Sequence, residues 1–314
     1  ARFRKRGEIS LDKKSRLFRA TDILLLVLAA LPIVFGMVLK VLINPISSEI
    51  EVTGAKIYFT LKMPLMNLPI TESQVNSWIV VIAIFWLCLW LTHGIKYGKG
   101  GKRQLICEYI VEKCEGLVHD NMDGYFSNFA PFVAAVMAIS AFSSLLTLVG
   151  LYAPTADLNI IGGWSILVFV LITHYKMKCG FLHYLGSFAD PIPLTPLNII
   201  SEVATPISMT FRHFGNVLSG SVISVLMAYF LQKLSAMLLG WLPGVLGTIP
   251  FLQIGLPAIL SLYFDIFSGL LQAFIFAMLT MLYISGGFPA DDFEKRRLKK
   301  EQKRKLKEQK LTAK

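Results

Sequence analysis

Two apolar stretches in the C-terminal half of the chain are too long to be ordinary upright membrane crossings. They cover residues 196–239 and 251–284, and both have the composition of helices. At about 1.5 Å per residue they are about 65 and about 50 Å long, whereas the hydrocarbon core of a bilayer is about 30 Å thick. We therefore predict that both helices are strongly tilted or nearly horizontal, and that they form a two-helix hairpin.

Further apolar runs predict the rest of the architecture. Hydrophobic residues make up 54% of the 314 positions and charged residues only 16%, against about a quarter in an average soluble chain. The sequence therefore predicts an all-α polytopic membrane protein with about six membrane-embedded helices. The four shorter spans are expected at residues 23–39, 78–91, 130–151 and 160–175.

Two polar segments complete this prediction. Residues 104–119 alternate apolar and acidic side chains with helical spacing, which indicates an amphipathic surface helix. Residues 44–77 are polar and contain several prolines, and they predict a short β-like excursion outside the membrane. Asp22 precedes the first apolar run and is a good residue to cap its helix.

The positive charge is concentrated at the two ends of the chain. The net charge is +5 over residues 1–22 and +8 over residues 294–314, while the rest of the chain carries −2 of the total of +11. Both basic segments adjoin apolar spans, so they indicate binding to anionic lipid headgroups rather than to nucleic acid. Both termini are then cytoplasmic. A signal peptide is the alternative for residues 23–39, but no small-residue cleavage pattern follows, so we expect a retained helix.

The first long helix carries ionisable and polar residues on one face. Glu202, Arg212 and Asn216 share this face with Thr205, Met209 and Ser219, because they follow i, i+3, i+4 spacing. An ionisable side chain within a membrane helix indicates a functional site. Arginine stays protonated at essentially any pH, so Arg212 is a fixed charge and not a proton carrier. We expect His213, which lies off this face, to be a hydrogen-bonded packing residue.

The second long helix offers two candidate neighbours for Arg212. Asp265 and Gln272 lie about two turns apart, or about 10 Å, so at most one of them sits beside the guanidinium. Gln272 is the better neighbour, because a neutral amide orients the guanidinium without cancelling its charge. Asp265 is then expected in a wet vestibule that passes ions. Asp157, in the turn between two spans, is either a simple helix cap or a charge that attracts cations.

Several segments resemble the a subunit of F-type ATP synthases. They are "TFRHFGN", "GSVISVLM" and "SGLLQAFIFAMLTMLYIS", with "ITESQVNSWIVV", "PTADLN" and "PLNIISEVATPIS" as further matches in the same order. The resemblance covers roughly residues 70–290. It implies two long, nearly horizontal helices beside a rotating c-ring, together with a peripheral stalk of b subunits and a catalytic head joined through the stalks.

The resemblance also implies roles for individual residues. Arg212 corresponds to the essential stator charge that faces the carboxylate of each c subunit, and Asn216 and Gln272 to its polar neighbours. Glu202 corresponds to an acid near the cytoplasmic exit. The segment that contains Asp157 and Asn159 corresponds to one near the outer half-channel.

The sequence departs from the family pattern in three places. Ser221 stands where many members carry an acid, and Asp265 stands where some members carry histidine, so an acid has moved between the two helices if these positions face each other. The span at residues 23–43 and its basic leader are an addition. We thus divide the chain into a cytoplasmic leader (1–22), an extra helix with an external loop (23–69), a subunit a-like domain (70–290) and a cytoplasmic tail (291–314).

We therefore expect the protein to translocate ions and not to bind or hydrolyse nucleotides. The chain has no GxxxxGK[ST] loop, so no nucleotide site or other cofactor is expected on it. It is then a non-catalytic subunit, in a bacterial plasma membrane, that conducts H⁺ or Na⁺. Two alternatives are a stand-alone secondary transporter, which often contains internal repeats that are not visible here, and a purely structural anchor.

Overall fold

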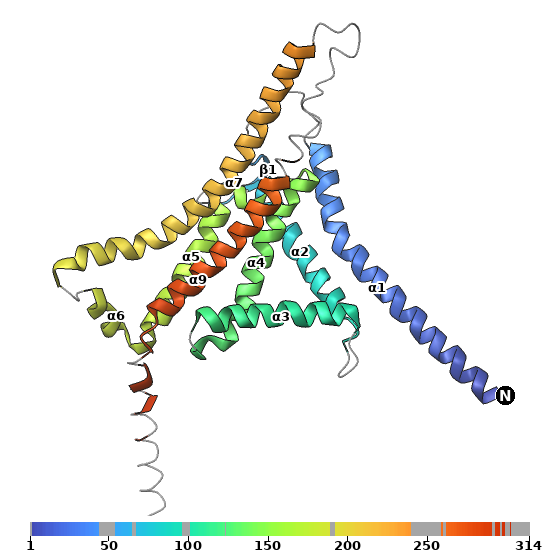
Figure 1. Ribbon diagram of the computed structural model, residues 1–314, viewed down its shortest axis with the longest axis horizontal. Helices are drawn as coiled ribbons and strands as arrows, with labels where there is room; N and C mark the ends of the chain where they lie inside the picture. The colour runs from blue at the N-terminus through green and yellow to red at the C-terminus, as the bar shows by residue number, and fades with distance from the viewer. Residues whose placement is uncertain are drawn as a thin grey trace, which may run out of the picture.

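The computed structural model describes residues 2–43, 54–64, 67–95, 101–122, 124–188, 192–239 and 262–290, with short pieces at 259, 293–295, 297–298 and 302. Over these residues the protein is almost entirely helical (Figure 1). Six helices in this part of the chain are long and apolar enough to cross a membrane. The predicted all-α polytopic class is therefore confirmed.

The shorter spans lie close to their expected positions. They are α1 (Arg2–Ile43), α2 (Glu72–Thr92), α4 (Ala130–Leu145), which the 3₁₀ turn η2 (Leu146–Val149) extends, and α5 (Leu158–Lys176). The surface helix α3 (Lys102–Asn121) follows α2, and the short helix α6 (Phe181–Phe188) follows α5.

Two helix boundaries differ from the expectation. The α2 helix begins at Glu72 instead of residue 78, because the Glu72 backbone N–H donates to the Lys56 carbonyl at 2.8 Å and the preceding strand runs directly into the helix. The prediction that Asp22 caps a helix is wrong, because α1 runs through this residue. The Asp22 carboxylate instead accepts a hydrogen bond from Arg103 Nη1 at 2.8 Å.

A small antiparallel hairpin precedes α2. It pairs β1 (Ile57–Leu61) with β2 (Leu68–Thr71), with Leu61 opposite Leu68. The predicted β-like excursion is confirmed for this part, while residues 44–53 and 65–66 lie outside the described residues.

The first long helix is α7 (Thr195–Leu239), which is 45 residues long. Figure 1 shows that it bends partway along, and that its first half is strongly inclined to α4. Pro206 lies inside α7 and removes one backbone hydrogen bond, which makes a helix easier to bend. The second long helix is described from the π-helix η8 (Leu262–Ser268) into α9 (Gly269–Gly287), and all but one residue of its expected start at 251–261 lie outside the described residues.

The core lies between α4, α5, α7 and α9 and is closed at one end by α3 and the 3₁₀ turn η1 (Gly124–Phe129). Its fully buried members include Val133, Val168, Met209, Phe276 and Met281. Lipid tails are as apolar as these side chains, so the helices associate through close packing and small residues. At the tightest point, a Cβ added to Gly269 of α9 would lie 2.4 Å from Ser144 Cβ of α4.

The two ends of the helix bundle differ. The β-hairpin, the α4–α5 connection and the C-terminal end of α1 lie at one end, which we call the hairpin end (Figure 1). The surface helix α3, α6 and the C-terminal end of α9 lie at the other, which we call the α3 end.

The contact between Gly269 and Ser144 gives a first test. We expect Gly269→Ala to destabilise the subunit by about 1–3 kcal/mol, because the added methyl group overlaps Ser144 and neither helix backbone can yield locally. Gly286→Ala in the same helix is the matched control, because a Cβ added to Gly286 would have no atom from outside its own helix within 4 Å. Thermal denaturation of the detergent-purified complex measures both. Equal stability of the two variants would contradict the packing described here.

Candidate functional site

A hydrogen bond between side chains joins the two long helices. Asn216 Nδ2 of α7 donates to Gln272 Oε1 of α9 at 2.7 Å. Gln272 lies on the buried face of α9, one turn from Gly269 and Phe276, and is only 2% exposed. A buried amide without a partner costs about 1–3 kcal/mol, so this bond fixes how α7 and α9 are rotated relative to each other.

Arg212 lies one turn before Asn216, on the exposed side of α7. Within the described parts of the chain, no side chain or carbonyl forms a hydrogen bond or an ion pair with its guanidinium. The sequence placed Gln272 beside it, but the Gln272 oxygen bonds to Asn216. The helix therefore carries an accessible charge whose partner is not found in the described part of its own chain.

His213 lies about 100° around α7 from Arg212 and is fully buried. Its Nε2 lies 3.4 Å from Ser140 Oγ of α4, and its ring makes edge contacts with Trp164 and Phe276. The expectation of a hydrogen-bonded packing residue is confirmed for one ring nitrogen. His213 thus contributes to the contact among four helices, and the exposed face of α7 does not include it.

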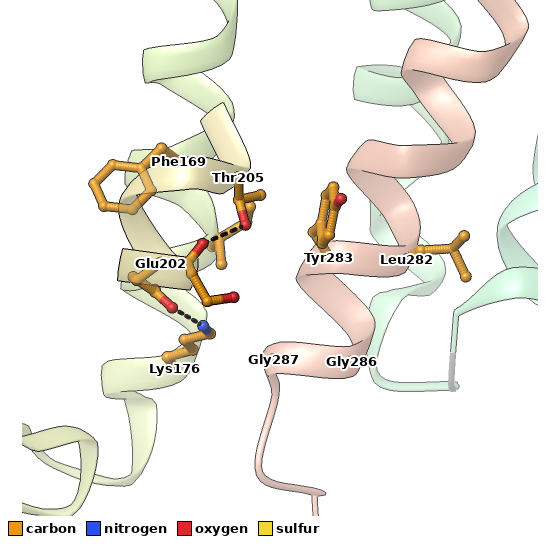
Figure 2. Close-up of a pocket in the computed structure, with 10 residues that line it drawn as sticks. Phe169, Lys176, Glu202, Thr205, Leu282, Tyr283, Gly286 and Gly287 are labelled. Carbon is orange, nitrogen blue, oxygen red and sulfur yellow. Dashed lines mark hydrogen bonds and ion pairs between the residues drawn. The ribbon is translucent and has the colours of Figure 1, made fainter. Parts of the chain in front are cut away.

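A cavity opens at the α3 end between α5, α7 and α9. It has a volume of about 280 Å³, and its lining includes Lys176, Glu202, Thr205 and Tyr283 (Figure 2). Lys176 Nζ donates to Glu202 Oε2 at 2.6 Å, and both side chains are largely buried. The predicted exit acid Glu202 therefore lies in a cavity, but it is paired with a lysine of the neighbouring span.

The hydroxyl of Tyr184, in α6, also reaches this carboxylate. It donates to Glu202 Oε1 at 3.4 Å. Burial, and next the negative charge of Glu202, raise the pKa of Tyr184, so the phenol remains a neutral donor at physiological pH. Both Glu202 oxygens thus have a partner among the described residues.

Asp157 lies at the hairpin end and caps α5. Its Oδ1 accepts from the Asn159 backbone N–H at 2.9 Å, which confirms the cap. Its Oδ2 accepts from the hydroxyl of Ser73, a fully buried residue of α2. Asp157 therefore joins the start of α5 to the start of α2 as well as capping its own helix. Asn159 is exposed in the first turn of α5.

A second acid at the hairpin end is not among the sequence-based candidates. Glu72 is 4% exposed, and its Oε1 accepts no hydrogen bond from the described residues. Lys40 Nζ of α1 lies 3.9 Å from that oxygen. The sequence analysis missed Glu72 because it placed the start of the span at residue 78. An acid in the first turn of an apolar helix was the available signal.

Ser221 and Asp265 belong to elements that meet. Ser221 lines a small hollow between α7 and η8 together with Asn216, Phe264 and Ser268. A Cβ on Gly220 would lie 3.4 Å from Phe264, so the two elements approach closely there. The backbone of Asp265 lies in η8, while its side chain lies outside the described residues. An acid transferred from one position to the other stays a prediction.

The fold and these residues define a polytopic α-helical membrane protein with polar sites at both ends and an exposed arginine between them. The family model for the ATP synthase A chain matches residues 74–285. The chain belongs to this family. It is thus an integral membrane protein, an ion-translocating stator subunit of an F-type ATP synthase, and acts in a complex with other subunits of that enzyme. The match gives no support to a stand-alone transporter.

Curated relatives are similar over most of their length. ATP synthase subunit a of Legionella pneumophila (strain Paris) is 27% identical over 231 residues, which are 73% of this chain and 91% of the relative. The Trichlorobacter lovleyi protein is 30% identical over 221 residues, 68% of this chain and 86% of the relative. The sodium ion specific subunit a of Propionigenium modestum is 25% identical over 268 residues, 75% and 85% of the two chains.

The bond between Asn216 and Gln272 gives a second test. We expect Asn216→Leu and Gln272→Leu each to destabilise the complex by about 1–3 kcal/mol, because each leaves the other amide unpaired. The double variant should lose less than the sum, with a coupling of about 1 kcal/mol. Denaturation of the purified complex measures all three. Ser219→Ala is the control, since its hydroxyl bonds only to its own helix, and strict additivity of the two leucine variants would argue against the bond.

Proposed function

We propose that ions cross this subunit through two half-channels, one from each end of the bundle, which meet the rotating c-ring along α7 at different places. The observation that carries the proposal is the exposed guanidinium of Arg212, which has no partner among the described residues. A charge on the outer face of a membrane helix costs several kcal/mol unless another protein compensates it. A succession of acidic groups on a turning partner supplies that compensation.

The outer half-channel begins at the hairpin end. Glu72 and Asp157 provide carboxylates there, and the Ser73 hydroxyl on Asp157 and the buried Asn76 extend the polar surface inward. From this group the path leads past the hollow at Ser221, where Asp265 is proposed as its inner acid, to the rotor. Acidic residues that face the interior of a helix bundle or a water-filled cavity attract cations and mark ion pathways.

The inner half-channel is the cavity that contains Glu202. An ion released from the rotor reaches Glu202 and replaces Lys176 as the partner of its carboxylate. The ion then leaves Glu202 for the cytoplasm. The cavity supports this assignment, because its volume of about 280 Å³ admits water next to a carboxylate at the α3 end. The Lys176–Glu202 pair then acts as the exit group of the path.

Arg212 separates the two half-channels. It attracts each emptied rotor carboxylate, drives the ion off that carboxylate, and blocks leakage by repelling cations. The neutralised rotor site can face lipid, which a bare charge cannot do without a large penalty. Each ion that crosses 100 mV supplies about 2.3 kcal/mol, so several ions are needed for each nucleotide made.

The proposed orientation places the α3 end in the cytoplasm. The basic segments 1–22 and 291–314 both continue from that end of the bundle, and cytoplasmic segments are enriched in lysine and arginine. The division into leader, extra helix, translocating domain (70–290) and tail belongs to this proposal. We also propose that the protein is located in a bacterial plasma membrane. Its proposed partners are the c-ring and the b subunits of a peripheral stalk.

The role of Arg212 can be tested in the assembled enzyme. We expect Arg212→Ala to abolish ATP-driven ion pumping in liposomes, because nothing then empties the rotor sites. Lys233→Ala removes another cation from α7, one that stacks on Tyr229, and should pump at the normal rate. Pumping is measured with a dye sensitive to the ion gradient, and assembly by the amount of subunit in the purified complex. Sustained pumping by a fully assembled Arg212→Ala complex would refute the proposal.

The role of Glu202 gives a separate test. ATP-driven pumping runs the proposed path in reverse, so ions enter through the Glu202 cavity in this assay. We expect Glu202→Gln to slow the pumping by about tenfold or more, since a charge-assisted bond to the entering ion contributes about 1.5–3 kcal/mol. Glu294→Gln is the control, because Glu294 is an exposed acid at the same end of the molecule and outside the cavity. An unchanged pumping rate in Glu202→Gln would remove this residue from the path.

A further inference from the structure

The added helix α1 turns a single stripe of residues toward the bundle. Asp22, Ile33, Gly36 and Lys40 are separated by eleven, three and four residues, which places them on one side of the helix. Most of the remaining large side chains from residue 23 onward are exposed, as expected for a lipid-facing surface. The contacts of α1 with the rest of the protein are therefore made by a few residues along one line.

These contacts fix the candidate membrane span of α1, Phe18–Ile43, near both of its ends and in its middle. At the α3 end, Arg103 donates to Asp22 at 2.8 Å and to the His93 carbonyl at 2.7 Å. In the middle, Gly36 lets α2 approach, because a Cβ there would lie 2.7 Å from Ile79 Cδ1. At the hairpin end, Lys40 donates to the Gly150 carbonyl at the turn that ends η2. The position of Lys40 is thus set by packing and by hydrogen bonds.

Lys40 lies beside an acid that has no other cation next to it among the described residues. Its Nζ lies 3.9 Å from Glu72 Oε1, and this is the only ion pair of Glu72 within the described residues. The Glu72 side chain is 5% exposed, against 39% for that of Lys40, so Lys40 is the more accessible member of the pair. The oxygen that Lys40 approaches accepts no hydrogen bond in the described structure.

The other titratable groups that the structure describes around Glu72 carry no compensating positive charge. Asp157 and Glu72 both act on Tyr152, whose pKa is raised, first of all by burial. Burial, and then Glu72, raise the pKa of Tyr58 to about 12. Both phenols are neutral at physiological pH, and Asp157 is an acid. Among the described residues, Lys40 is therefore the one cation that lies close to Glu72.

We propose that α1 holds Lys40 as a tethered counter-ion at the mouth of the outer half-channel, where its ammonium competes with the incoming ion for the Glu72 carboxylate. This inference rests on the proposed function, in which Glu72 belongs to the outer path. An arriving cation has to displace Lys40 or share the carboxylate with it, and like charges repel. Lys40 thereby raises the external ion concentration that half-saturates transport, and is a positioning residue of that path.

A simpler reading gives Lys40 a purely anchoring role. It stands in the last turn of α1, where a cation interacts favourably with the helix dipole, and it bonds a backbone carbonyl. That role does not involve Glu72. The two readings therefore differ in whether the effect of Lys40 depends on the Glu72 charge, and a double-mutant cycle separates them.

The experiment uses the complete complex in liposomes, driven by an imposed gradient, with ATP synthesis followed as external pH or external sodium is varied. We expect Lys40→Gln to lower the half-saturating external ion concentration by about threefold, as for loss of one partly exposed charge pair. Lys40→Arg should keep the original value. Lys62→Gln is the matched control, because Lys62 is an exposed lysine of the same hairpin end with no ion pair in the described structure.

The background variant Glu72→Gln decides between the readings. In that background Lys40→Gln should produce no further shift, whereas an equal shift in both backgrounds would overturn the proposal. So would a Lys40→Gln value equal to that of Lys62→Gln. Lys40→Met retains the unbranched stem and replaces Lys40→Gln if the latter assembles poorly.

Failure of this inference is distinguishable from failure of the proposed function. If Arg212→Ala is inactive while Lys40→Gln behaves like the control, only the role of Lys40 is wrong. If the Arg212→Ala complex pumps ions, the proposed function itself is wrong.

Discussion

The need to compensate a charge inside a bilayer governs this structure. Two pairs of polar side chains in the helix bundle satisfy each other: Asn216 bonds Gln272, and Lys176 pairs with Glu202. Arg212 departs from this pattern, because it is exposed and lacks a partner in the described part of the chain. In a lipid environment that arrangement is stable only when another protein supplies the opposite charge. The subunit thus leaves the charge of Arg212 to be compensated by another protein.

Small residues allow the close helix contacts that set the positions of the polar groups. The contact of Gly269 with Ser144 brings α9 against α4, and that of Gly220 with Phe264 brings α7 against η8. Lipid provides no hydrophobic force between helices, so such contacts and the few buried hydrogen bonds determine how each helix is rotated. The rotation of α7 in turn determines that His213 faces the core while Arg212 faces outward. Packing in the interior therefore decides which charge is presented to the partner.

The sequence alone predicts the spans and the unusual length of α7, because apolar length is a strong signal in membrane proteins. It also indicates Arg212 and the cap at Asp157. It does not give the contacts between elements far apart in the chain, such as Gln272 with Asn216 and Lys176 with Glu202. Glu72 was missed for a local reason: β2 leads into α2 without a loop, so the helix starts earlier than its apolar residues suggest. Pairing across elements requires the fold.

The attachment of the membrane span of α1 near both of its ends has a mechanical consequence. Asp22 and Lys40 are held by different parts of the bundle and are separated by about 27 Å of continuous helix. The length of a helix along its axis hardly changes under load, so this segment transmits force between the two ends of the bundle. A force applied to this segment at the α3 end is therefore transmitted to the hairpin end, where Lys40 bonds the Gly150 carbonyl and lies beside Glu72.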